Sequence, residues 1–509
     1  MKRLAILLCA VLILIGMTIA GVNPASSAMQ VPPTNTKRPT VASLPPTNTP
    51  KNVAPVQPDQ PTLVPTKTLV PSRTPLPSKT PTLTPSITPT TIGPVNYPDN
   101  INTLTGLPYP NEEARNRRNL IVKVSNYTWV VRPQSGLSQA DLVWEYEVEG
   151  GVTRFAAIYR SQASDHVGSV RSGRLPDLEL VTMYQALLAY SGSNDNIKKM
   201  ILEGSCIDPT SGSRVLCSKD NPDLIPAPEW KYQAITPQFG DNCPPFCRFP
   251  RTGLAFEHTL FANTNQVWDV ATKRNVNTGI PARGFAFNIT PDAGGKTASD
   301  IFIKWFGDQD ARWQYNPTDG KYYRWNTGLP HVDANTGQQL SADNVIIIQA
   351  NHKERHDVYE SESGSPAIEV QLWGQEKAWV FRDGKWYEGT WQRRNRARGA
   401  LVLMSGDGKT PIHLKPGNSW VEVVRCCDMH GVKASDTLID VQGTATFAAM
   451  TATAKFPHVS DARATQTAVI AVQTNAVSAA TAGINLPPTQ TPNPADITET
   501  PQLVGMAAP

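Results

Sequence analysis

The sequence reads DLVWEYEVE over Asp141–Glu149, then GG at Gly150-Gly151 and TRFAAIYR over Thr153–Arg160. In the first segment every second residue, from Leu142 to Val148, is apolar, and the other residues of the segment include three glutamates. Alternation with a period of two is typical of a β-strand with one buried face. Because a Gly-Gly step separates the two segments, they predict an antiparallel β-hairpin.

The sequence on either side of this hairpin predicts a mixed α/β domain over residues 99–285. Leu120–Ser125 (LIVKVS) is a short apolar run, typical of a buried strand. Leu175–Ala189 has apolar residues at helical spacing, and Leu187–Ser191 followed by Asn194–Leu202 predicts a second strand–helix unit.

Residues 297–428 are predicted to form a β-rich C-terminal domain, so the chain is assigned to the α+β class. The expected strands are Ile301–Trp305, Tyr322–Trp325, Asn344–Ala350, Ala367–Trp373, Ala378–Arg382, Trp386–Trp391 and Ser419–Val424. Asp-Gly steps favour tight turns and occur at Asp319-Gly320, Asp383-Gly384 and Asp407-Gly408. The domain boundary is expected between Val276 and Ser299.

The first 28 residues predict export. Lys2 and Arg3 precede an apolar run, and Ser26-Ser27-Ala28 offers small residues at a cleavage point. The apolar run over residues 4–22 also approaches the ~20 residues that span a bilayer, so a membrane tether is the alternative. Both interpretations place the rest of the chain outside the cytoplasm.

Two low-complexity segments flank the body. Of the 45 prolines, 18 lie in residues 29–98, where Thr-Pro and Val-Pro steps predict a disordered, extended stalk. Residues 435–509 are rich in Ala and Thr and predict a second flexible extension. The formal net charge of +4 is too small to indicate a nucleic-acid partner.

Long motifs in both halves give the chain a resemblance to a known family. They are Arg132–Leu137 (RPQSGL), Val148–Phe155 (VEGGVTRF), Val167–Arg174 (VGSVRSGR), Gly328–Asp333 (GLPHVD), Phe381–Gly384 (FRDG) and Gly389–Trp391 (GTW). The chain resembles the YerB-type family of bacterial envelope lipoproteins. The resemblance implies an exported two-domain protein of unknown function, usually lipid-anchored, with a suspected association with cell-wall synthesis.

The chain departs from that family in two respects. Cys9 lies inside the apolar run and does not resemble a lipid-attachment cysteine. An insert over residues 205–252 carries four cysteines, Cys206, Cys217, Cys243 and Cys247. Outside the cytoplasm four such cysteines favour two disulfides over a zinc knuckle, with the local pairing Cys206–Cys217 and Cys243–Cys247 as one of three possibilities. The adjacent Cys426 and Cys427 are not expected to bond to each other.

The strongest constellation of acidic and basic residues forms the main candidate ligand-binding site. Its members are Glu145, Glu149, Arg154, Arg171, Arg174 and Asp177. Paired carboxylates are the machinery of glycoside hydrolysis, which makes Glu145 and Glu149 the catalytic candidates. Nearby arginines lower carboxylate pKa values, whereas a general acid needs a raised pKa, so an anion-binding site or a structural ion-pair network is favoured.

Histidines offer further candidates. His331 with Asp333 could bind a ligand or a metal, or act as a base with its partner, although a turn role is favoured. His352 and His356 have metal-ligand spacing only on a helix, and the context favours a solvated loop. His258 is expected to be a packing residue. No nucleophile elbow, phosphate loop or dinucleotide fingerprint is present, and no cofactor or bound metal is predicted.

A basic cluster follows Trp391: Arg393, Arg394, Arg396 and Arg398. It is interpreted as a solvated hairpin tip, with an anionic wall polymer or lipid headgroup as the alternative. Together these features favour a non-catalytic envelope protein that binds a cell-wall polymer or a membrane-bound envelope protein. A cell-wall polysaccharide hydrolase or lyase using Glu145 or Glu149 is the second hypothesis, and a purely structural surface protein the third.

Overall fold

The computed structural model describes residues 91–127, 129–227, 234–237, 243–250, 253–305, 309–359, 364–396, 399–427 and 431–437. These residues belong to one compact unit. The predicted export segment, the stalk up to residue 90 and the tail beyond residue 437 lie outside them. Within the described ranges no helix has the length and apolar character needed to cross a membrane.

The largest sheet of the described part of the chain has eleven strands, which come from both halves. The N-terminal half supplies β1 (Leu120–Ser125), β2 (Leu142–Val148), β3 (Val152–Tyr159), β5 (Leu187–Ala189) and β9 (Ala234–Ile235). The C-terminal half supplies β13 (Lys296–Thr297), β19 (Asn344–Ala350), β22 (Gly374–Arg382), β23 (Lys385–Arg393), β24 (Val402–Ser405) and β26 (Ser419–Arg425). Their order is β13–β23–β22–β19–β26–β2–β3–β1–β5–β9, with β24 beside β23.

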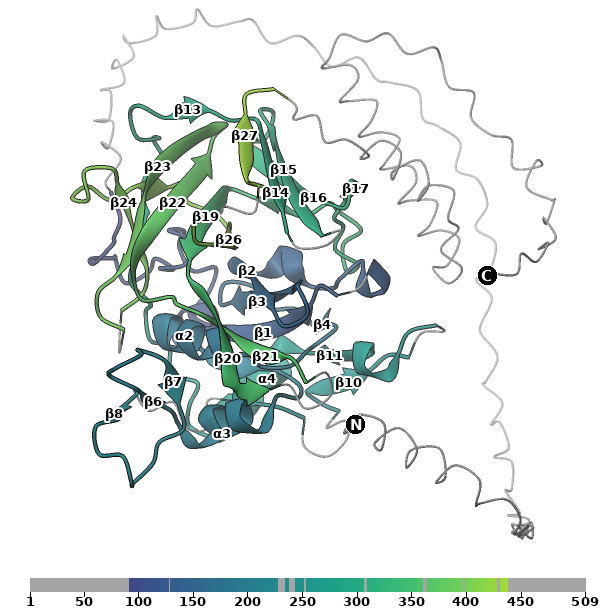
Figure 1. The fold of residues 1–509 in the computed structure, drawn as a ribbon. Helices are drawn as coiled ribbons and strands as arrows, with labels where there is room; N and C mark the ends of the chain where they lie inside the picture. Colours follow the sequence, from purple (N-terminus) through teal and green to yellow (C-terminus); the bar gives the residue numbers. More distant parts are fainter. Residues whose placement is uncertain are drawn as a thin grey trace, which may run out of the picture. The chain divides into compact units, whose positions relative to one another are not determined.

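The junction between the halves is a pair of parallel strands. β26 pairs in parallel with β19 on one side and with β2 on the other, so a strand near residue 420 lies beside one near residue 143 (Figure 1). Glu145 is the register partner of Glu422 in this pairing. Because the backbone hydrogen bonds run on from one half into the other, the two halves share one sheet.

Smaller sheets surround the main one. The C-terminal half adds β14 (Asp300–Lys304), β15 (Asp310–Asn316), β16 (Lys321–Asn326), β17 (Leu329–Pro330), β18 (Ser341–Ala342) and β27 (Lys433–Ser435) as a second sheet. The other strands are β4 (Val167–Gly168), β10 (Phe246–Arg248) and β11 (Leu260–Ala262); β6 (Cys206–Ile207), β7 (Arg214–Val215) and β8 (Ile225–Pro226); β12 (Ala286–Phe287) and β25 (His413–Leu414); and β20 (His352–Tyr359) and β21 (Pro366–Val370).

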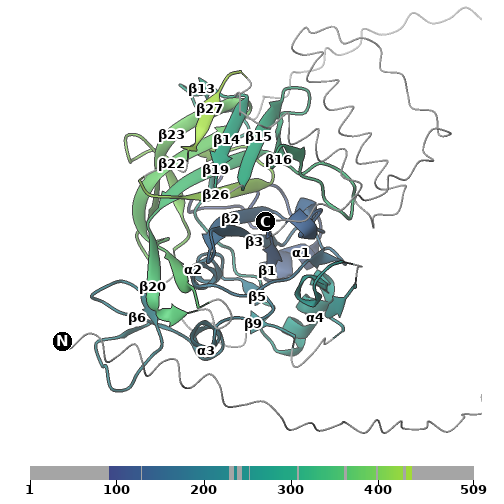
Figure 2. The ribbon, with the colours of Figure 1, turned by 45° about the vertical axis from the view of Figure 1, so that its right-hand side comes forward.

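Helices are few and short. They are α1 (Glu112–Asn116), α2 (Leu175–Tyr184), α3 (Asp195–Glu203) and α4 (Thr264–Lys273), with 3-10 turns η1 (Trp129–Val131), η2 (Leu137–Gln139) and η3 (Phe256–His258). Buried residues of α2 and α3 join the apolar core on one face of the main sheet, whereas those of α4 and the second sheet join the core on the other face. The β20–β21 hairpin extends from the C-terminal half and packs against α2 (Figure 2).

The predicted α+β class, with a mixed N-terminal half and a β-rich C-terminal half, agrees with this architecture. β1 and β19 have the predicted bounds, and the Asp383-Gly384 turn joins β22 to β23 with both residues at positive φ, +50° and +69°. Positive φ at both central residues is the signature of a type I′ hairpin turn.

Three local expectations are corrected. The helix predicted over Leu175–Ala189 ends at Tyr184, because Gln185 turns left-handed and Leu187–Ala189 pairs with β1. His352 and His356, expected in a loop, lie in strand β20. The stalk was predicted to reach residue 98, but Ile92 pairs with Phe287 and so begins the packed body.

Candidate functional site

Strands β2 and β3 direct their polar side chains to opposite faces of the main sheet. Tyr146 lies opposite Arg154 on the face that α2 covers, whereas Glu145 lies opposite Phe155 on the other face. Adjacent residues in a strand point to opposite sides. The predicted six-residue constellation is therefore divided: Glu145 belongs to one network, and the remaining five residues lie around the other.

We call the second group the arginine site: Arg154, Arg171, Arg174, Glu149 and Asp177. Arg174 is the N-cap residue of α2, and its Nε lies 2.5 Å from Glu149 Oε2. Asp177 Oδ2 accepts a hydrogen bond of 2.7 Å from the Arg174 backbone N–H. The other oxygen of Glu149 accepts from the backbone N–H of Ile368 in β21, at 3.1 Å, and this ties the C-terminal half to the site.

A buried lysine, Lys123, pairs with Asp177 of the arginine site. Lys123 Nζ lies 3.0 Å from Asp177 Oδ1, and both side chains are fully buried. The Tyr146 hydroxyl donates to the same carboxylate oxygen. Burial lowers the pKa of Lys123 to about 8, although the charge of Asp177 opposes this. The negative charge of Asp177 is thus matched within the protein.

Arg154 differs from the other cations of the site. Its side chain and backbone are only 6% exposed, and among the described residues its guanidinium makes one hydrogen bond, 3.2 Å, to the Thr153 carbonyl oxygen. Burial, and next the charges of Arg171 and Arg174, lower the pKa of Arg154 to about 9. A guanidinium has five donors, and buried charges are normally paired. Arg154 therefore holds donor capacity that the described protein groups leave unused.

The Arg171 loop lies between β1 and η3. The Arg171 backbone N–H donates to the Lys123 carbonyl oxygen at 3.0 Å, and its Nη1 donates to the Glu257 carbonyl oxygen at 3.4 Å. His258 follows in η3, is 7% exposed, and its Nδ1 has no hydrogen-bond partner in the described structure. Burial and the positive charges of Arg171 and Arg154 lower the pKa of His258. His258, predicted to be a packing residue, thus lies beside the arginine site.

Glu145 belongs to a buried network that joins the two halves, here called the bridging network. Its carboxylate is fully buried, pairs with Arg324, and accepts hydrogen bonds from Asn126 Nδ2 at 2.9 Å and Thr153 Oγ1 at 2.5 Å. Glu422 is its register partner. Burial, and next the charge of Glu145, hold the pKa of Glu422 well above its usual range.

His331 is also part of the bridging network. Its Nδ1 lies 2.5 Å from Arg324 Nη1 and its Nε2 lies 2.6 Å from Gln134 Oε1. A neutral ring with the proton on Nε2 satisfies both contacts, since Arg324 can only donate. Burial and the charge of Arg324 hold the pKa of His331 well below its usual range. His331 is therefore neutral and enclosed.

Asp333 has a positioning role across the halves. Its carboxylate accepts hydrogen bonds from the backbone N–H groups of Gly136 at 3.0 Å and Ser138 at 2.7 Å. It also accepts from Asn335 in its own turn at 2.9 Å. The structure thus places the predicted ligand-binding pair His331 and Asp333 away from the arginine site and in contacts within the protein.

A third charged cluster was missed in the sequence. Glu179, on α2, is buried and contacts three arginines: Arg214 at 2.5 Å, Arg393 at 2.5 Å and Arg396 at 2.6 Å. Burial by itself would raise the pKa of Glu179, but these charges hold it well below the usual range. The basic run after Trp391 was the available signal, and its interpretation as a solvated tip is wrong for Arg393, which is 1% exposed. Arg394 is exposed, and Arg398 lies outside the described residues.

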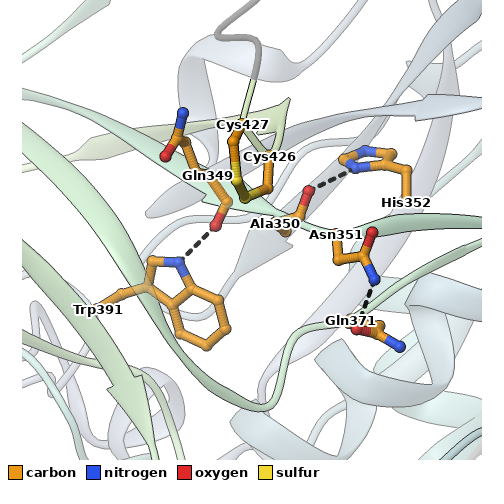
Figure 3. The surroundings of a disulfide bond; sticks show 8 residues. All are labelled: Gln349, Ala350, Asn351, His352, Gln371, Trp391, Cys426 and Cys427. Carbon is orange, nitrogen blue, oxygen red and sulfur yellow. Dashed lines mark hydrogen bonds between the residues drawn. A yellow bond between two sulfur atoms is a disulfide. The ribbon is translucent and has the colours of Figure 1, made fainter.

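The cysteines of the insert are joined locally. Cys206 bonds to Cys217 and Cys243 to Cys247, with Cα–Cα distances of 5.0 and 4.6 Å. Cys426 and Cys427 bond to each other across a cis peptide, contrary to our expectation, with Cα atoms 3.1 Å apart. Figure 3 shows this pair beside Ala350, whose carbonyl accepts from the Cys426 N–H at 2.7 Å. No group of three or more His, Cys, Asp or Glu side chains is placed to hold a metal within the described ranges.

Comparisons with known proteins agree with this two-part architecture. Residues 104–277 match the N-terminal domain, and residues 301–421 the C-terminal domain, of a protein family of unknown function, DUF3048. The chain belongs to the DUF3048 family. It is 25% identical over 338 residues to "Putative lipoprotein YerB" of Bacillus subtilis strain 168. The alignment covers 65% of this chain and 88% of that protein.

The crystal structure of the YerB protein from Bacillus subtilis shares the fold. It aligns with a TM-score of 0.51 and 21% sequence identity, over 66% of this chain and 99% of the other. The predicted resemblance to the YerB-type family is therefore confirmed. The DUF3048 descriptions attach no activity to either domain.

Proposed function

We propose that this DUF3048 protein is a non-catalytic, extracytoplasmic binding protein whose arginine site holds an anionic group of an envelope component. The observation that carries the proposal is Arg154, a buried cation that makes a single hydrogen bond among the described residues. An anion placed against Arg154 supplies the charge and the acceptors that the site lacks, since charge-assisted hydrogen bonds are the strongest that a guanidinium makes.

The proposed location rests on the sequence and on a relative. The positively charged N-terminus and the apolar run over residues 4–22 are typical of an export segment or a membrane tether, and the Pro/Thr-rich stalk would set the reach of the body. The similar Bacillus subtilis protein is named a lipoprotein. The proposed ligand is accordingly a cell-wall polymer or a membrane-bound envelope molecule that carries negative charge.

The hydrolase hypothesis receives less support. Its two candidate carboxylates, Glu145 and Glu149, lie in separate networks, and each is paired with an arginine. Glu145 has no solvent-exposed surface. Hydrolysis of a glycoside needs two carboxyl groups about 5–10 Å apart on either side of one bond, and one of them must carry a proton.

The test is sedimentation of the full chain with purified cell walls. We expect the wild-type chain to pellet with walls and Arg154→Met to lose at least about tenfold in affinity, because a hydrogen bond to a charged group contributes about 1.5–3 kcal/mol. Arg394→Met is the matched control, since Arg394 is exposed and should leave binding unchanged.

The soluble fraction of the same experiment tests the hydrolase hypothesis. Mass spectrometry would look for released wall fragments in the wild type, Glu145→Gln and Glu149→Gln. Release that disappears in either variant while the fold persists would make the protein an enzyme and refute the proposal. If walls retain the wild type and Arg154→Met equally, the protein binds walls through a surface other than the arginine site.

A further inference from the structure

The arginine site is bordered by several buried polar atoms without partners. In the described part of the chain Ser169 Oγ, Tyr190 Oη and His258 Nδ1 make no hydrogen bond, although each residue is buried. Buried polar groups are normally satisfied, so such atoms commonly mark the position of a water or an ion. Tyr190 lies close enough to Asp177, and His258 to Arg154 and Arg171, for the charges of the arginine site to act on both side chains. Ser169 lies two residues before Arg171 in the loop of residues 169–174.

Backbone contacts bring the segments that carry these residues together. Val170 bridges to Val124 on β1, and its N–H donates to the Leu260 carbonyl oxygen at 2.7 Å, so η3 and β11 lie against the loop. Arg154 is the register partner of Ser125, the residue that follows Val124. The Tyr190 ring lies beside Gly173, since a Cβ on that glycine would be 3.1 Å from it. Polar groups with unused hydrogen-bonding capacity thus come from four segments of the chain. They belong to Arg154 in β3, Ser169 in the loop, His258 in η3 and Tyr190 after β5.

We infer that the group bound in the arginine site is a phosphate. The inference rests on the proposed function and narrows its ligand class. A carboxylate is planar and offers two oxygens, which a single guanidinium fork can satisfy. A phosphate is tetrahedral, and its non-bridging oxygens point in several directions, which fits donors that arrive from separate elements.

His258 gives the site a reporter. Its ring lies near the guanidinium groups of Arg154 and Arg171, and their repulsion helps to keep the pKa low. A bound phosphate offsets the positive charge of the two arginines, which favours the protonated ring. Binding should therefore raise the pKa of His258, and NMR can follow this in the wild-type chain without any substitution at the site.

Calorimetry of the full chain in detergent would use glycerol 3-phosphate and inorganic phosphate, with glucuronate as the carboxylate probe, at equal ionic strength. We expect the phosphates to bind at least about tenfold more tightly than glucuronate. Arg154→Met and His258→Asn should each weaken phosphate binding about tenfold, while Arg394→Met should not. Thermal unfolding would check that each variant folds, and the NMR shift of His258 remains a test if one does not.

Two further probes separate the sources of the phosphate. A soluble poly(glycerol phosphate) chain represents a wall polymer, and soluble dihexanoylphosphatidylglycerol represents a lipid headgroup. Binding of either, lost in Arg154→Met, supports the inference. Two outcomes would overturn the inference of a phosphate and leave the proposed function intact. One is tighter binding of glucuronate than of phosphate. The other is the absence of phosphate binding while walls still retain the protein through Arg154. If the wild-type chain binds neither phosphate nor cell walls, both the inference and the proposed function are refuted.

Discussion

The bridging network and the arginine site lie on opposite faces of the same strands, and their charges are matched in different ways. Glu145 contacts Arg324, Asn126 and Thr153, so its charge is satisfied by side chains from both halves. Arg154, nine residues further along, has one hydrogen bond to a carbonyl oxygen in the described structure. A network that satisfies itself holds a fold together, whereas one with unused donors is suited to a ligand.

The largest expected effect is the loss of Arg324 from the bridging network. Arg324→Met leaves the Glu145 carboxylate buried without its cation, which should lower the free energy of unfolding by about 3–5 kcal/mol. Urea denaturation of the full chain would measure this, with Arg394→Met as the exposed control. A loss below about 1 kcal/mol would show that the bridging network does not hold the halves together.

A pH-dependent effect follows from Glu422. Its pKa is raised in the folded protein, so the folded state binds the proton more tightly than the unfolded state, and this stabilisation is fully present below pH ~4.5. It is lost as the pH rises toward the folded-state pKa, with a limiting slope of about 1.4 kcal/mol per pH unit. Glu422→Gln should flatten that slope between pH 5 and 8 in urea titrations. If the free energy of unfolding has the same pH slope in the wild type and in Glu422→Gln, a group other than Glu422 takes up the proton.

A smaller effect is expected for Glu149→Gln in the arginine site. The substitution removes the negative charge of the Arg174–Glu149 ion pair. It also leaves one acceptor oxygen where Glu149 has two, one for Arg174 and one for the Ile368 N–H, so the cost should be about 1–2 kcal/mol. Thermal unfolding would provide the value. A cost as large as that of Arg324→Met would contradict the distinction between the two networks.

The smallest effect on stability is expected for Arg154→Met. The change removes a buried charge with one hydrogen bond, so the free energy of unfolding should change by less than about 0.5 kcal/mol or increase. The same variant is expected to lose anion binding. If it destabilises the protein by more than about 2 kcal/mol, Arg154 is a structural residue and the comparison fails.

The alternation in Leu142–Val148 and the apolar run Leu120–Ser125 predicted their strands because both patterns are local. Strand β20 was missed because its sequence, HKERHDVY, is highly charged and shows no alternation of apolar residues. Arg355 and Val358 are its only buried residues. It is stabilised by pairing with β21 and by packing on the N-terminal half, which its own residues do not reveal.

The candidate site was predicted in part. Glu149, Arg154, Arg171, Arg174 and Asp177 were named from the sequence, and the structure brings them together. Glu145 was grouped with them because it alternates with Glu149 along the predicted strand, yet it points to the other face of the sheet. His258, Lys123 and Tyr190 were not connected with the site, since each comes from a separate element and carries no motif that indicates the arginines.

The sequence by itself determined the α+β class, the resemblance to a two-domain envelope family, the bounds of β1 and β19 and the Asp383-Gly384 turn. These depend on side-chain periodicity and turn geometry over a few residues. Only the tertiary structure decided that β26 lies between β19 and β2, that Glu145 meets Arg324 across 179 residues, and that Glu179 meets Arg393 across 214. Whether a buried charge is satisfied depends on such distant contacts, and so the division between bridging network and arginine site appears only in the folded chain.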